Sequence, residues 1–92
     1  MNKKRRLMID AYKTNLAALS ATLSSIHVAL QDLAEEEQSC MDNMPESLQE
    51  SQRYASMEEA YDALSEAVDL IADAIENLET AQERLEDAQN VD

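Results

Sequence analysis

The 92-residue sequence contains no glycine, tryptophan or phenylalanine, and only one proline and one cysteine. Strands and tight turns usually depend on glycine and on aromatic or β-branched residues, so these absences disfavour a β-sheet fold. Strong helix formers dominate instead, chiefly alanine, leucine, glutamate, glutamine and methionine. An apolar content of 45% favours a packed core despite a net charge of -13. We therefore expect one all-α domain over residues 1–92.

Paired cysteines and long apolar runs are also missing. Cys40 has no second cysteine to pair with, and one unpaired thiol is typical of a reducing compartment, so we expect a cytoplasmic protein. The basic start is followed by an apolar run, Leu7–Ile9, that is too short for a signal peptide. No run approaches the roughly 18 apolar residues of a transmembrane helix, so we expect no membrane association.

Apolar residues recur at spacings of three and four in both halves of the chain, over about four heptads each, which is typical of coiled-coil-like helices. In the first half they are Ile9, Tyr12, Leu16, Leu19, Leu23, Ile26, Leu30 and Leu33. In the second half they are Met57, Tyr61, Leu64, Val68, Ile71, Ile75, Leu78 and Leu85, with Gln82 as the polar exception. The pattern predicts an antiparallel two-helix hairpin.

Pro45 separates the two patterns and cannot continue a helix, so the first helix should end near residue 42. Ser47 and Glu50 have the spacing of a capping box, which favours a short turn. Ser56 and Glu59 form a second capping box directly before the second pattern. The expected boundaries are about 3–42 for helix one, about 43–55 for the connector and about 56–90 for helix two.

Antiparallel pairing of the two patterns predicts a register in which Leu30 faces Leu64 and Tyr12 faces Gln82, close enough for a hydrogen bond. A register shifted by seven residues is the alternative. The predicted register also sets the basic residues 3–6 beside Glu86, Asp87 and Asp92.

Two helices cover only one flank of each apolar stripe, and small scaffolds without disulfides or metals usually oligomerise. Helix two carries a second stripe, the predicted dimer face: Ala60, Ala63, Ala67, Leu70, Ala74 and Ala81. Helix one carries a matching stripe of small residues: Ala11, Ala18, Thr22, Ser25 and Ala29. Two packing faces on one helix favour a homodimeric four-helix bundle. The alternative is that alanine serves only as a helix former on a wet surface.

The chain offers little for catalysis or metal binding. No carboxylate lies on either heptad pattern, and Ser24 stands where a Glu-x-x-His metal motif around His27 would need glutamate. Cys40 lies near the end of helix one beside Glu35–Glu37, a setting that disfavours a thiolate. We therefore expect no catalytic residue, no metal site and no cofactor, and a protein that is not an enzyme.

Negative charge is concentrated in the second half, where residues 57–92 contain twelve carboxylates and one cation, Arg84. Ten of these carboxylates share one face and form an acidic ridge about 40 Å long: Glu59, Asp62, Glu66, Asp69, Asp73, Glu76, Glu79, Glu83, Glu86 and Asp87. The predicted partner-binding residues are Glu59, Asp62, Glu66, Asp69, Asp73, Glu76 and Glu83.

The spacing of charges along the acidic ridge, about 5 to 6 Å, is not far from that of phosphates along a nucleic-acid strand. One interpretation is a nucleic-acid mimic that occupies the basic groove of another protein. The other is a solvated face, although such faces usually mix lysine with glutamate. The same charge disfavours direct nucleic-acid binding.

The connector reads Asn43-Met44-Pro45-Glu46-Ser47-Leu48-Gln49. It resembles that of an uncharacterised family of small acidic helical-hairpin proteins of bacteria and phages, in which the motif is N-L-P-E-S-L-Q; here Met44 takes the place of leucine. The resemblance implies no activity but favours a phage or mobile-element setting. We expect a non-enzymatic protein-interaction module, with an inhibitor of a basic-grooved nucleic-acid-binding protein (the anti-defence type) as the alternative. The apolar connector residues either cap the core or contact a partner: Met41, Met44, Leu48, Tyr54 and Met57.

Overall fold

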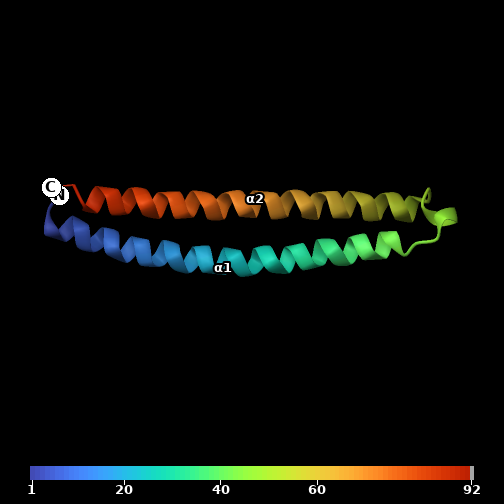
Figure 1. Ribbon diagram of the computed structural model, residues 1–92, viewed down its shortest axis with the longest axis horizontal. Helices are drawn as coiled ribbons and strands as arrows, with labels where there is room; N and C mark the ends of the chain where they lie inside the picture. Colours follow the sequence, from blue (N-terminus) through green and yellow to red (C-terminus); the bar gives the residue numbers. More distant parts are fainter. Residues whose placement is uncertain (92) are drawn as a thin grey trace.

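The computed structural model describes residues 1–91. Two long helices, α1 (Lys3–Asp42) and α2 (Gln52–Gln89), run antiparallel, side by side, with both chain termini at the same end (Figure 1). A short 3-10 helix, η1 (Glu46–Leu48), lies in the connector at the opposite end. The predicted all-α hairpin is confirmed. Its extents of 69 × 15 × 14 Å make it a rod.

Side-chain caps set where the helices begin. The Asn2 side chain accepts a hydrogen bond from the Arg5 backbone N–H at 2.9 Å, and the Ser51 hydroxyl accepts one from Tyr54 at 3.2 Å. Helix α1 ends at Asp42, as predicted. Helix α2 begins about one turn earlier than predicted, because its cap is Ser51 and Ser56 lies inside the helix. The short turn predicted after Pro45 is present, but Pro45, which precedes it, provides no side-chain cap.

The core is a single seam between the two helices, made of residues that are buried or half-buried on the facing sides. On α1 they are Arg6, Ile9, Lys13, Leu16, Ser20, Leu23, His27, Leu30, Ala34, Glu37 and Met41. On α2 they are Tyr54, Met57, Tyr61, Leu64, Val68, Ile71, Ile75, Leu78, Gln82, Leu85 and Gln89. The seam predicted for the second helix is therefore confirmed, and Tyr54 and Gln89 extend it at the two ends.

The seam predicted for the first helix is half wrong. Four of its eight apolar residues lie outside the seam, with exposed fractions between 41% and 57%: Tyr12, Leu19, Ile26 and Leu33. The residues that follow them take their places: Lys13, Ser20, His27 and Ala34. The physical reason is that α1 is apolar over a stripe wider than one helix can cover. Smaller residues such as Ser20 and Ala34 also allow α2, with its leucines and isoleucines, to approach closely.

The register also differs from the prediction. Gln89 hydrogen-bonds to Arg6, Asp10 and Lys13, a set centred about one turn further along α1 than residue 5, which the predicted register sets opposite Gln89. When Leu30 is set at the level of Val68, nearly every seam residue of α1 lies level with a seam residue of α2. The observed register therefore lies between the predicted one and its alternative. Tyr12 is exposed, and the Gln82 amide donates to the Leu78 carbonyl at 3.2 Å, so the expected Tyr12–Gln82 pair is absent from the described residues.

The hairpin buries very little. Among residues 1–91 only three side chains are buried, each with 8% of its surface exposed: Ala34, Met41 and Val68. The accessible surface is 6806 Å², whereas a compact protein of this mass exposes about 5,400 Å². The radius of gyration of 20.5 Å likewise exceeds the roughly 12 Å of a compact chain of this length. The fold therefore leaves an unusually large surface available for contacts.

Candidate interaction surfaces

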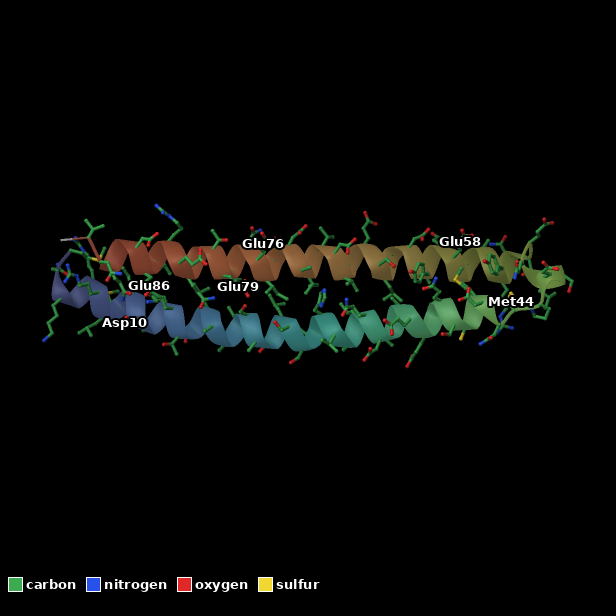
Figure 2. The ribbon with its side chains drawn as sticks, viewed as in Figure 1. Asp10, Met44, Glu58, Glu76, Glu79 and Glu86 are labelled. Atoms are coloured by element: carbon green, nitrogen blue, oxygen red, sulfur yellow. The ribbon has the colours of Figure 1, made fainter. Side chains whose placement is uncertain are left out.

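The acidic ridge runs along nearly the whole of α2. All ten of its carboxylate residues are exposed. Figure 2 labels three residues of the ridge on α2, namely Glu76, Glu79 and Glu86. It also labels Glu58, a carboxylate outside the ridge that lies near the connector end. The one ion pair of the described residues joins Arg84 and Asp87 at 3.1 Å, with side chains 78% and 62% exposed. A pair so exposed contributes about 0–1 kcal/mol. Arg84 offsets only one of the ten carboxylate charges, so the ridge remains strongly negative.

The ends of the chain are held by a cluster around Gln89 that the sequence patterns did not reveal. Its side-chain amide donates to the Arg6 carbonyl at 3.0 Å and to the Asp10 carboxylate, and its carbonyl oxygen accepts from the Lys13 ammonium at 2.9 Å. The Arg6 guanidinium donates to the Val91 carbonyl at 3.1 Å. Basic residues do lie near the C-terminal end of α2, as predicted, although Asp92 falls outside the described residues and no ion pair to Glu86 or Asp87 forms from them.

The hairpin has two long sides with different chemistry. Residues that directly follow seam positions share one side, because Gln31 and Glu35 of α1 line a common hollow with Ser65 and Asp69 of α2. Residues that directly precede seam positions therefore share the opposite side. Within residues 8–33 of α1 and 60–81 of α2 this opposite side is uncharged, and we call that part of it the neutral side. Charged residues that precede seam positions lie beyond these two ranges: Arg5, Glu36, Arg53 and Arg84. On α1 it consists of Met8, Tyr12, Asn15, Leu19, Thr22, Ile26, Ala29 and Leu33; on α2 it consists of Ala60, Ala63, Ala67, Leu70, Ala74, Asn77 and Ala81.

The neutral side includes the whole predicted dimer face of α2. Ala60, Ala63 and Ala81 are exposed, Leu70 is 65% exposed, and the remaining two alanines, next to the seam, are half-buried. No residue of the neutral side is charged, and none of the ridge carboxylates belongs to it. The four large apolar residues displaced from the predicted seam of α1 lie on this same side. The neutral side therefore combines a large apolar stripe on α1 with a small-residue stripe on α2.

Helix α1 is uncharged between Lys13 and Asp32. By length and composition this helix is apolar enough to cross a membrane, although none of its most apolar 18-residue stretch is buried in the hairpin. The expectation of no such helix rested on consecutive apolar residues, whereas serines and threonines interrupt the apolar residues of α1. The Thr22 and Ser25 hydroxyls donate to backbone carbonyls four residues earlier, at 3.1 and 3.4 Å, which lowers the cost of removing them from water.

The connector closes one end of the seam. Met41 is buried, and Met44, Tyr54 and Met57 are half-buried, so these four residues cap the core as one interpretation predicted. Figure 2 places Met44 at this end of the rod. Leu48 differs, since 49% of it is exposed at the tip.

The two residues considered for catalysis or metal binding, Cys40 and His27, lie in different parts of the hairpin. Cys40 is a free, exposed thiol beside Glu36 and Ser39, and His27 is half-buried in the seam. Residues 1–91 contain no group of three or more histidine, cysteine, aspartate or glutamate side chains arranged to hold a metal ion.

The fold and its surfaces define an elongated, acidic, two-sided helical hairpin. The chain matches no protein-family profile, no curated protein and no solved structure.

Proposed function

We propose that the chain is a non-enzymatic protein-interaction module that presents the acidic ridge of α2 to a basic partner protein. The observation that carries this proposal is the one-sided charge: ten exposed carboxylates along a single helix, with Arg84 as the one cation among them. Such a surface attracts and orients a positively charged partner at a distance of about 8–10 Å at physiological salt. The resemblance of the connector favours a phage or mobile-element setting for this module.

A second candidate is favoured by the geometry of the ridge. A straight helix projects its carboxylates in a line about 40 Å long, and their spacing approaches that of nucleic-acid phosphates. A rod 14–15 Å thick is also slender enough to lie in an open groove. Under this alternative the chain mimics nucleic acid and inhibits a basic-grooved nucleic-acid-binding protein.

Two matched variants test the role of the ridge. Each variant replaces four carboxylates by the corresponding amides. The ridge variant changes Asp62, Asp69, Glu76 and Glu83. The control variant changes Glu35, Glu36, Asp42 and Glu46. Both lose four negative charges from exposed positions. The tagged chains are used to capture proteins from a bacterial lysate, with quantitative mass spectrometry as the measurement. We expect the ridge variant to lose at least about 90% of the partner, since each desolvated charge contact contributes about 1 kcal/mol or more, and the control variant to retain most of it.

Equal losses in both variants would reduce the effect to bulk charge and contradict the proposal, as would capture that persists in about 0.5 M salt. The captured partner also separates the two candidates. A mimic requires a partner that binds nucleic acid and is displaced from the chain by a DNA or RNA duplex. If neither duplex displaces the partner, the proposal of a protein-interaction module stands and the proposal of a nucleic-acid mimic is contradicted.

A further inference from the structure

We propose that two copies of the chain pack through their neutral sides, forming a four-helix bundle whose outer surface carries the acidic ridges. This inference concerns the side of the hairpin away from most of the ridge charge, so it does not depend on the proposed function. The occupant of the neutral side is therefore a second copy of this chain.

The apolar stripe on α1 is wider than α2 can cover. Its eight large residues form one continuous band, and α2 covers only the half that lies in the seam, as with Leu16, Leu23 and Leu30. The other half, with Leu19, Ile26 and Leu33, is turned about 60° from the first round the helix axis and lies about 90° from the middle of the seam. A helix that is apolar over two adjoining faces is the corner of a bundle, with one neighbour on each face. The hairpin supplies one neighbour, and a second hairpin supplies the other.

The distribution of charge also favours a second copy of the chain as the occupant of the neutral side. A chain of net charge -13 repels its own copies unless the contact keeps carboxylates apart. The neutral side meets this condition, because it carries no charge from Met8 to Leu33 on α1 or from Ala60 to Ala81 on α2. A basic partner would gain nothing here, whereas it would gain at the acidic ridge. Charge complementarity therefore directs foreign basic partners to the ridge and leaves the neutral side to a surface equally uncharged.

The exposed area of the hairpin is large enough for a dimer interface. The chain exposes 6806 Å², about 1,400 Å² more than a compact protein of its mass. A stable dimer of standard size buries about 800 Å² on each partner. The total exposed surface therefore exceeds that of a compact protein by more than a stable dimer buries on each partner. Among residues 1–91 only three are buried, and no element besides α1, η1 and α2 is present to cover the neutral side.

A lipid bilayer is a poorer occupant. Helix α2 accompanies α1 along its whole length, so inserting the uncharged part of α1 as a hairpin would carry ridge carboxylates such as Asp69, Asp73 and Glu76 into the hydrocarbon. Each carboxylate near the bilayer centre opposes insertion strongly. Pairing of two neutral sides avoids this, because every ridge carboxylate stays in water.

Two double variants on α1 test the inference. Leu19→Glu with Ile26→Glu places two carboxylates on the neutral side, where these residues are 53% and 41% exposed. Ala21→Glu with Val28→Glu places the same charges on the opposite side, where both residues are exposed. Dimer dissociation constants come from sedimentation equilibrium. We expect the neutral-side variant to dimerise at least about 100-fold more weakly, since buried unpaired carboxylates are strongly disfavoured. The control should stay within about threefold of the parent chain.

Thiol reactivity gives a second readout that needs no disruptive charge. On a Cys40→Ser background, Ile26→Cys and Val28→Cys are each labelled with a maleimide over a range of protein concentrations. We expect Ile26→Cys to become protected as concentration rises and Val28→Cys to react at a constant rate. Equal weakening by both double variants, equal reactivity of both thiols, or protection of Ile26→Cys that appears only when phosphatidylcholine vesicles are added would overturn the proposal.

Discussion

At the residue scale, one hydroxyl decides where α2 begins. Ser51 accepts a hydrogen bond from the Tyr54 N–H, whereas Ser56 lies inside the helix and is exposed. We expect Ser51→Ala to lower the free energy of unfolding by about 1 kcal/mol, because an orphan N–H loses its acceptor. Ser56→Ala should be neutral or stabilising by up to about 0.5 kcal/mol, since alanine is the better helix former. Chemical denaturation monitored by circular dichroism measures both.

If Ser56→Ala lowered the free energy of unfolding more than Ser51→Ala, the helix cap would be Ser56, as the sequence pattern predicted, and the observed cap would be contradicted. That pattern could not decide between the two serines. Ser56 with Glu59 has the spacing of a capping box, while Ser51 has no acidic residue three positions later. The end of α1 was predictable because Pro45 excludes a continuing helix. The Gln89 cluster was not, because its partners come from the other end of the chain.

At the scale of the helices, the seam separates residues that hold the hairpin together from residues that do not. We expect Leu30→Ala to lower the free energy of unfolding by about 2 kcal/mol, because Leu30 is half-buried against α2. Val28→Ala should change it by less than about 0.5 kcal/mol, since Val28 is 56% exposed and faces away from both α2 and the neutral side. Urea denaturation of the two variants at equal concentration provides the comparison; equal effects would contradict the observed seam.

The helices themselves could be predicted from the heptad spacing, and the α2 seam agrees at every apolar position. The rotation of α1 could not, for a physical reason. Ile9, Leu16, Leu23 and Leu30 belong equally to two overlapping heptad patterns, one with Leu19 and Ile26 and one with Ser20 and His27. A single sequence favours the more apolar pattern. The structure adopts the other, which leaves the larger side chains outward.

At the scale of the whole molecule, we propose that the two sides of the rod bind different partners: the acidic ridge a basic protein and the neutral side a second copy of the chain. The acidic ridge was predictable from composition and spacing, and its exposure agrees with that prediction. The neutral side could not be recognised as one surface from the sequence, because its α1 half had been assigned to the hairpin seam. Once α1 is rotated, that half joins the alanines and Leu70 of α2. A stripe that the sequence assigned to the core becomes part of an exposed, uncharged surface.

The mass of the unaltered chain in solution tests this account most directly. Sedimentation equilibrium, or light scattering coupled to size-exclusion chromatography, gives that mass without relying on the rod shape. We expect about twice the 10.3 kDa of one chain, with a helical circular-dichroism spectrum. A particle of 10.3 kDa that keeps this helical spectrum at every concentration would show that the hairpin is stable alone, and would contradict the account.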